Sequence, residues 1–247
     1  MDSSVYNRLF EIDRQHWWFR GRLAIFEAVL NKLLKPEEVR TILDVGCGSG
    51  ANFPVLAKFG EVYGVDSSEE AISFLKDKGF EKVFKGELPY LSFDKKFDLI
   101  TLFDVLEHIE DDGAALRNIS QILTDRGLIM LSVPAHKFLW SDYDELVHHK
   151  RRYGKKELVA KIQSQGYEIE LATYFNTFLA IPAFAVKLIK KAPVINKILP
   201  DSELDLNIGP ANELLSLIFS SERYLLKHLN FPMGLSLLFV ARKRPQN

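Results

Sequence analysis

A turn with three alternating glycines follows the first apolar run of the chain, and its residue types suit the binding of a nucleoside. The run LDVGCGSG at 43–50 comes at the end of a stretch, 39–45, that is typical of a buried parallel strand. Glycines at this spacing allow positive φ and leave no Cβ between the backbone and a ligand. Twenty residues after Gly46, Asp66 ends the next predicted strand, where its carboxylate could accept hydrogen bonds from both hydroxyls of a ribose. Together these features predict a Rossmann-like nucleoside site.

An acid just before the first glycine separates two classes of cofactor. Gly46, Gly48 and Ala51 formally match the dinucleotide fingerprint, in which alanine is allowed at the third position. Asp44, however, is poorly placed beside a pyrophosphate and well placed beside an ammonium group. S-adenosylmethionine carries an ammonium and a sulfonium and no phosphate. The run therefore resembles the first motif of class I S-adenosylmethionine-dependent methyltransferases.

Later motifs extend this resemblance over about half of the chain. Residues 62–66 resemble the ribose-binding strand, 86–89 follow the third strand, and 97–100 open the fourth. The resemblance implies an α/β, Rossmann-like seven-stranded mixed sheet with helices on both faces and an antiparallel last strand. It implies S-adenosylmethionine as cofactor and S-adenosylhomocysteine as product. The cofactor-binding residues expected on this basis are Asp44, Gly46, Cys47, Gly48, Gly50, Asn52, Asp66, Ser67, Glu87, Leu88 and Phe103.

Each of these residues also has a purely structural interpretation. The glycines could make only a tight turn, and Asp66 could cap the helix that is predicted to begin near Ser67. The resemblance implies that Glu87 accepts a hydrogen bond from the adenine amino group, but Glu87 could also be an acid in the first turn of a helix. Phe103 could be a core aromatic at the end of the fourth strand.

Three potential ligands or bases lie within five residues at the end of the fourth predicted strand. Asp104, Glu107 and His108 begin where open α/β sheets bind their ligands. Metal-dependent O-methyltransferases of the ubiquinone-pathway type look similar here, but with Glu in place of Asp104. A divalent metal would need a remote ligand such as His148 or His149, and we favour polar groups that orient the cofactor over a metal site. The candidate general bases are His108, His148 and His149.

Two further segments are expected to form the acceptor side. Basic and imidazole groups gather at 148–156, where they would attract an anion, or else form the solvated start of a helix. Three consecutive aromatics at 17–19 cannot all face one side of a helix, so at least one should reach the cleft or the substrate. This N-terminal segment resembles a bacterial methyltransferase subgroup that often accompanies surface-glycan and lipid-linked sugar pathways. The expected substrate-contacting residues are Trp17, Trp18, Arg20, Trp140, Tyr143, Arg151, Arg152 and Tyr153.

The elements that must position these residues alternate along the chain. This alternation demands a parallel sheet with right-handed crossovers. Strands are predicted near 40–45, 61–65, 81–85, 97–103, 127–133, 167–174 and 235–242, and helices near 6–34, 51–58, 68–78, 112–123 and 155–165.

Length and composition agree with one methyltransferase domain over 1–247. We expect an N-terminal helical lid at 1–36, a cofactor-binding half at 37–134 and an acceptor-side half at 135–247. The 32 Lys and Arg nearly balance the 33 Asp and Glu, so no global field recruits nucleic acid. The single cysteine excludes an internal disulfide framework and fits a reducing compartment.

An apolar region near 175–230 separates the last two predicted strands. Residues 178–186 are apolar nearly all round, and four lysines follow before residue 198. A buried helix or a substrate-covering insertion is one interpretation, and a helix in a membrane interface is the other. No apolar run approaches the ~20 residues needed to span a bilayer, and no signal peptide is expected at the N-terminus. We therefore expect a cytoplasmic protein, and favour the buried helix or insertion over peripheral membrane contact through 175–199.

These observations predict a methyltransferase that acts by in-line displacement on an oxygen of a small or lipid-linked anionic metabolite. N-methylation of a small molecule is the alternative within the same class. Two alternatives come from other classes. One is an NAD-dependent dehydrogenase, which would need a second substrate domain. The other is a non-catalytic protein that binds S-adenosylmethionine or docks on a membrane.

Overall fold

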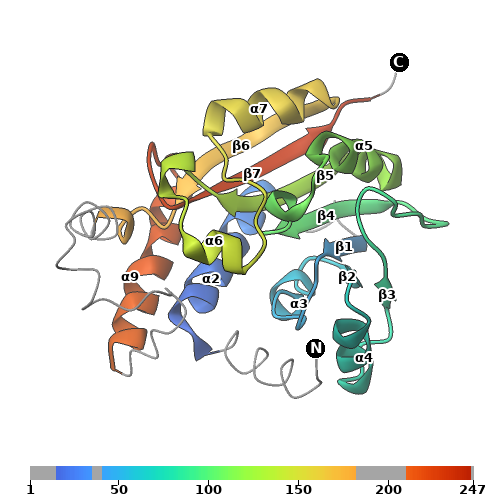
Figure 1. The fold of residues 1–247 in the computed structure, drawn as a ribbon, viewed down its shortest axis with the longest axis horizontal. Coiled ribbons are helices and arrows are strands. Elements are labelled where there is room, and N and C mark those ends of the chain that lie inside the picture. The colour runs from blue at the N-terminus through green and yellow to red at the C-terminus, as the bar shows by residue number, and fades with distance from the viewer. Residues whose placement is uncertain (1–14, 35–40, 182–209, 246–247) are drawn as a thin grey trace.

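A seven-stranded sheet forms the centre of the computed structural model, which describes residues 15–34, 41–181 and 210–245 (Figure 1). The strand order is β3-β2-β1-β4-β5-β7-β6. The first five strands are parallel, and β7 runs antiparallel to both β5 and β6. The mixed sheet and its antiparallel last strand are thus confirmed. The strands are β1 (Thr41–Val45), β2 (Glu61–Asp66), β3 (Val83–Lys85), β4 (Phe97–Phe103), β5 (Leu123–Pro134), β6 (Tyr167–Phe175) and β7 (Ser236–Lys243).

Helices cover both faces of the sheet, as Figure 1 shows. Apolar side chains of α5 and α7 form one core with the sheet, and those of α2 and α9 form another on the opposite face. A smaller cluster joins α3 and α4 to β3. The helices are α2 (Trp17–Leu33), α3 (Phe53–Leu56), α4 (Glu69–Asp77), α5 (Asp112–Ile122), α6 (Asp142–Leu146), α7 (Lys155–Ser164) and α9 (Pro210–Leu226). None of the helices in the described ranges is long and apolar enough to cross a bilayer.

Two predicted elements differ clearly from the structure. The fifth strand begins at Leu123 rather than near 127, because Leu123 directly follows α5 and pairs with Phe97 of β4. The helix predicted near 51–58 is only the four residues of α3. Helix α2 begins at Trp17, after His16, whose side chain accepts a hydrogen bond from the backbone N–H of Trp18, and Gln15 before it is also helical. The rest of the predicted N-terminal helix, 6–14, lies outside the described residues, as do 182–209 of the apolar region.

Helices α2 and α9 approach each other closely although they are far apart in the sequence. A Cβ at Gly21 of α2 would lie 2.3 Å from the ring of Phe219 in α9, so only glycine allows this approach. The rings of Trp17 and Trp18 lie 5.9 and 5.2 Å from that of Phe219, measured between centroids. Trp17 and Trp18 therefore help to pack α2 against α9.

A buried carboxylate on α9 binds the turn that follows β6. The backbone N–H groups of Thr177 and Phe178 donate to Oε1 of Glu222 at 2.6 and 2.8 Å, and Glu222 is fully buried. Burial raises the pKa of this carboxyl to about 7.

We expect this pKa to make the protein less stable at alkaline pH. A raised native pKa gives stability that is complete below the ordinary value near 4.5 and is lost as pH rises through about 7. The free energy of unfolding, measured with urea, should therefore fall by about 1–3 kcal/mol between pH 5 and pH 8 from this group alone. Glu222→Gln should remove that slope. Glu213→Gln, at an exposed carboxyl of the same helix, should keep it. Equal slopes in wild type and Glu222→Gln would contradict the assignment.

Candidate cofactor and acceptor site

The glycine turn after β1 lies against the carboxyl end of β2. The N–H groups of Gly46 and Cys47 both donate to the carbonyl of Val65, at 2.8 and 3.1 Å. Gly46, Gly48 and Gly50 have φ values of +70°, +51° and +77°, which glycine adopts at little cost. A Cβ at Gly46 would collide with Val105, whereas the space beside Gly48 is open. Gly48 is therefore the place where a ligand can lie against the backbone.

Asp66 at the end of β2 binds both this turn and the start of α4. Its Oδ2 accepts the N–H of Gly48 at 2.9 Å, and its Oδ1 accepts the N–H of Ser68 at 2.9 Å. The residue that caps α4 is Ser68, whose hydroxyl accepts the N–H of Ala71. Asp66 is only half-buried, so its carboxylate can still meet a ribose. Ser67 is exposed beside it.

Asp44 at the end of β1 is a buried carboxylate with two neutral donors. The hydroxyl of Thr101 donates to it at 2.6 Å and the amide of Asn52 at 3.0 Å. Burial raises its pKa to about 6. A cation beside Asp44 would favour the ionised form of its carboxyl. The residues around Asp44 therefore fit the ammonium group of S-adenosylmethionine. Burial also raises the pKa of the Cys47 thiol, which makes a reactive thiol role unfavourable.

The remaining cofactor candidates divide between the turn after β3 and the core. Glu87 is exposed in that turn, and Leu88 beside it is half-buried against the core. The ring of Phe103 is buried and stacks on Phe26 of α2, with 4.1 Å between centroids. The structure therefore places Phe103 as a core aromatic, which the sequence left as an alternative to cofactor contact.

Beyond β4, the structure groups a different trio from the one that the sequence suggested. One ligand atom each from Glu107, His108 and His149 lie within 4.8 Å of one another. Asp104 is not among them, because its carboxylate binds Arg22 and the hydroxyl of Ser132. A carboxylate and two imidazoles are donors that a divalent metal can use.

Glu107 is the most unusual member of this cluster. It is fully buried, and neither carboxylate oxygen has a hydrogen-bond partner in the part of the chain that the structure describes. Burial, followed by the charge of Asp104, raises its pKa well above the ordinary value. Its Oε1 lies 3.9 Å from Nε2 of His149. The cluster therefore combines a buried carboxyl of raised pKa with an imidazole that faces it.

Asp144 of α6 orients this imidazole and was not singled out from the sequence. Oδ1 of this buried carboxylate lies 2.8 Å from Nδ1 of His149 and accepts a hydrogen bond from Nε of Arg152 at 2.7 Å. The N–H of Ser141 also donates to it. With Nδ1 held by Asp144, Nε2 of His149 is the nitrogen left to face Glu107. His148, in contrast, is exposed and adopts a φ of +61°.

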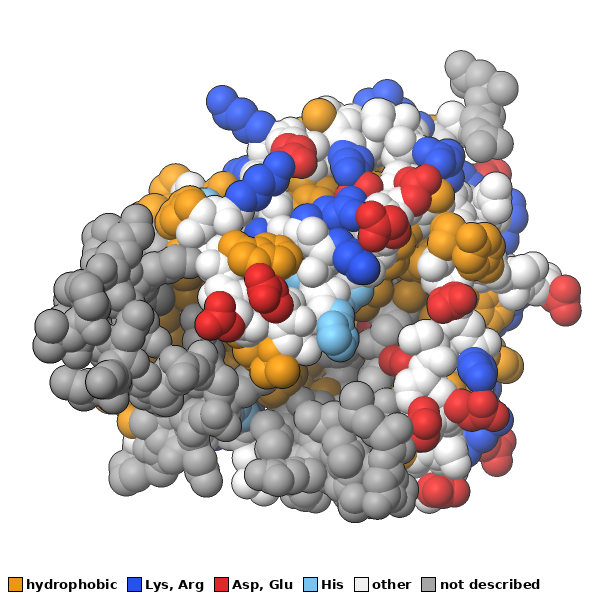
Figure 2. All heavy atoms as spheres, viewed as in Figure 1, with side chains coloured by type: hydrophobic (Ala, Val, Ile, Leu, Met, Phe, Trp, Pro, Cys, Tyr) orange, Lys and Arg blue, Asp and Glu red, His pale blue; other side chains and the backbone are white. Residues whose placement is uncertain are grey.

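Two arginines of the basic segment at 148–156 have acidic partners within the chain. Arg152 pairs with Asp144, and Arg151 lies 3.2 Å from Asp112 and donates to the carbonyl of Glu110. Figure 2 shows basic and acidic side chains interleaved on this side of the molecule. Asp112 lies in α5 and Asp144 in α6, both outside the basic segment.

The aromatic residues that we expected to contact the substrate differ in how exposed they are. Tyr153 is a core residue instead of a pocket wall, and its hydroxyl donates to the carboxylate of Asp112 at 2.9 Å. Trp17 and Trp18 are half-buried against α9, as described above. Trp140 and Tyr143 are partly exposed near α6. Arg20 pairs with the exposed Glu213 of α9.

Comparison with known proteins agrees with this geometry. Residues 15–172, which are more than half of the chain, match the family described as a methyltransferase domain. The chain belongs to this methyltransferase family.

Relatives and solved structures extend the family assignment. The methyltransferase is 24% identical over 162 residues to a "Probable S-adenosylmethionine-dependent methyltransferase" of Mycobacterium tuberculosis, covering 64% of this chain and 58% of that protein. It is 31% identical over 104 residues to a ubiquinone biosynthesis O-methyltransferase of Coxiella burnetii, covering 39% and 44%. The chain thus matches little more than half the length of the first of these relatives. A crystal structure of an S-adenosylmethionine-dependent methyltransferase from Mesorhizobium loti shares the fold, with a TM-score of 0.59, 18% identity and coverage of 89% and 98%.

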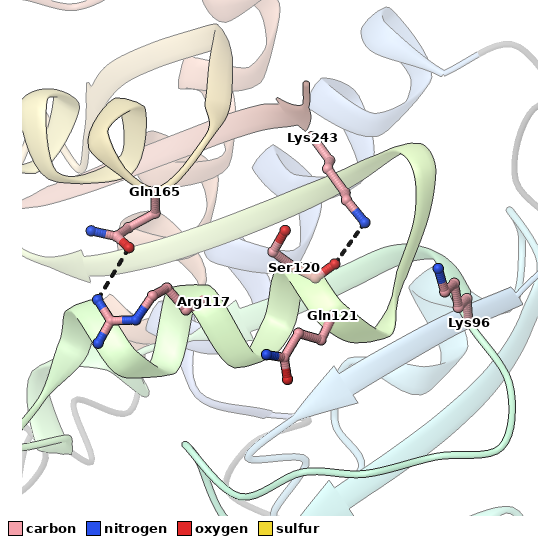
Figure 3. Close-up of a pocket in the computed structure, with 6 residues that line it drawn as sticks. All are labelled: Lys96, Arg117, Ser120, Gln121, Gln165 and Lys243. Carbon is pink, nitrogen blue, oxygen red and sulfur yellow. Dashed lines mark hydrogen bonds between the residues drawn. The ribbon is translucent and has the colours of Figure 1, made fainter. Parts of the chain in front are cut away.

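The methyltransferase also has a polar hollow of about 430 Å³ far from the glycine turn. Figure 3 shows Lys243 near the end of α5, where its ammonium donates to the carbonyl of Ser120 at 2.8 Å. This contact satisfies a carbonyl at the helix C-terminus. The hollow lies at the amino ends of the parallel strands and holds none of the predicted site residues. Its lining residues are Lys96, Arg117, Ser120, Gln121, Gln165 and Lys243.

Arg22 is the second residue that the sequence analysis missed. It is buried in α2, pairs with Asp104, and its positive charge acts to lower the pKa of both Asp44 and Glu107. No signal in the sequence separates it from Arg20, since both arginines precede apolar residues at spacings of three and four.

Proposed function

We propose that this methyltransferase transfers the methyl group of S-adenosylmethionine to an oxygen of a small or lipid-linked metabolite. The observation that carries the proposal is the position of the Glu107–His149 pair at the same sheet edge as Asp44 and Asp66. In open α/β sheets this carboxyl edge is where ligands bind. Because Arg151 and Arg152 already have acidic partners, the proposal assigns neither of them to an anionic group of the acceptor.

Each end of the cofactor has a group of matching chemistry in this chain. When bound, S-adenosylmethionine supplies a methyl group that is already activated, so the protein mainly positions the acceptor and excludes water. Asp44 would hold the ammonium and Asp66 the ribose hydroxyls, while Glu87 lies in the turn where the adenine is expected. The balanced charge of the chain leads us to propose no nucleic-acid acceptor and, with its single cysteine, a cytoplasmic location.

His149 is the residue that we propose as general base. An oxygen nucleophile loses a proton as it is methylated, and an imidazole is suited to accept it near neutral pH. The contact of Nδ1 with Asp144 leaves Nε2 to take the proton and stabilises the imidazolium that forms. His108 lies beside it, with 4.8 Å between ring centroids.

The test of this function begins with S-adenosylmethionine labelled in the methyl group. The protein is incubated with separated lipid and aqueous fractions of a cell extract, and the labelled product is identified by mass spectrometry. We expect a methyl ether or ester. A methyl amine would instead establish the N-methyltransferase alternative. Binding of the cofactor without transfer to any fraction would favour the non-catalytic alternative.

Substitution of the histidines then tests the assigned base. With the identified acceptor, His149→Gln should lower kcat by about 10²–10⁴-fold and leave the affinity for S-adenosylhomocysteine unchanged. His108→Gln and His148→Gln, measured alongside, should have smaller effects. A His149→Gln variant that keeps the wild-type kcat would remove His149 from the reaction.

A further inference from the structure

Helix α9 has apolar residues on both its inner and its outer face. On the inner face, Phe219 and Leu226 are buried in the core with α2, beside the buried Ser216 and Glu222. On the outer face, Leu214, Leu217 and Tyr224 are 57%, 68% and 57% exposed. A helix on the surface of a protein in water normally has polar residues on its outer face. The outer face of α9 therefore has a composition that suits an apolar environment.

Neighbouring residues enlarge this apolar surface at the C-terminal end of the helix. The turn after β6 lies beside α9 through the bonds from Thr177 and Phe178 to Glu222. Of the 13 large apolar residues that are exposed in the described ranges, 8 belong to α9 or to these adjoining turns. We call these eight the α9 patch: Phe178, Ile181, Leu214, Leu217, Tyr224, Leu225, Leu229 and Met233. Concentration of exposed apolar residues in one place marks an interaction surface.

The charges beside the α9 patch favour an anionic partner. Lys227 is exposed and Arg223 half-buried at the C-terminal end of the helix. Glu213, the acid on the exposed side, already pairs with Arg20 of α2. Glu222 is buried and faces inward. The uncompensated charge along this edge is therefore positive, which attracts the anionic lipids of a membrane surface.

The outer face of α9 by itself is smaller than a stable dimer interface. A helix of 17 residues is about 25 Å long, so one face about 10 Å wide offers about 250 Å². A stable dimer buries about 800 Å² on each partner. A single amphipathic helix, in contrast, is enough to lie in a bilayer interface.

We propose that the methyltransferase docks on anionic lipid bilayers through the α9 patch, with the outer face of α9 lying in the interface. This surface is separate from the glycine turn and from the Glu107–His149 pair. The inference therefore does not depend on the acceptor, although a lipid-linked acceptor would be reached from the same membrane.

Vesicle flotation tests this proposal with the full chain. The probe is vesicles of phosphatidylcholine, alone or with about one third phosphatidylglycerol. The wild type should float with the anionic vesicles and much less with the neutral ones. Leu214→Ser/Leu217→Ser should weaken partitioning about tenfold, because two leucines leave the interface. Phe138→Ser/Leu146→Ser, at residues 68% and 71% exposed elsewhere, should float like the wild type.

Three results would overturn the proposal. The wild type could fail to float. The double leucine variant could float as well as the wild type, which would place the contact elsewhere in the chain. Light scattering could show a dimer that this variant dissolves, without flotation, which would make a second copy the partner. Affinity for S-adenosylhomocysteine, measured in the absence of vesicles, separates these results from a failure of the proposed function. If the double variant loses that affinity, Tyr224→Ser repeats the flotation test at another position of the patch.

Discussion

Asp66→Ala is expected to weaken the binding of S-adenosylhomocysteine by about 5- to 150-fold, or about 1–3 kcal/mol. Two losses add up in this variant. The ribose hydroxyls lose their acceptor, and the N–H groups of Gly48 and Ser68 lose the carboxylate that holds the turn. Isothermal titration calorimetry measures the affinity directly, with NADH as a ligand that should not bind.

A matched variant separates the local effect from general damage to the strand. Glu61 begins the same strand, β2, and is exposed at the end away from the glycine turn. Glu61→Ala should bind S-adenosylhomocysteine like the wild type. If Asp66→Ala kept the wild-type affinity, Asp66 would not belong to the site.

Binding of S-adenosylhomocysteine is expected to weaken below pH 6 because of Asp44. Burial raises the pKa of this carboxyl to about 6, so it is neutral in most molecules at pH 5 and charged at pH 7. Only the charged form attracts the ammonium of the ligand, and the affinity should therefore fall about tenfold between pH 7 and pH 5. Calorimetry at several pH values measures this dependence.

Asp44→Asn tests whether this residue is the cause. The amide keeps the size of the side chain but cannot ionise. The variant should therefore bind S-adenosylhomocysteine about 10- to 150-fold more weakly than the wild type does at pH 7, and its affinity should not change with pH. The step near pH 6 should also disappear. A step that persists in Asp44→Asn would belong to another group.

Local signals in the sequence predicted the two strands and the glycine turn between them. The strand, the glycine turn and the acid at the end of the next strand are consecutive, so periodicity and spacing place them without knowledge of the fold. Gly46, Gly48 and Gly50 all adopt the positive φ that the pattern predicts. The seven-stranded mixed sheet and the antiparallel β7 followed from resemblance to a family.

The acceptor side was harder to predict because its contacts join distant segments. Tyr153 looked like a pocket residue until the fold brought Asp112 of α5 against it. Asp104 and Glu107 are neighbours in the sequence, yet one pairs with Arg22 of the N-terminal helix and the other is buried without a partner in the described ranges. Such pairings depend on packing between elements, which no local pattern encodes.

The measurement that tests the central claim most directly is a crystal structure of the complex with S-adenosylhomocysteine. We expect the ligand to lie over Gly48, with its ribose hydroxyls within hydrogen-bonding distance of Asp66 and its amino group on the Asp44 side. The adenine should lie beside Glu87 and Leu88. A ligand bound at another edge of the sheet, or a ribose without contact to Asp66, would contradict this account.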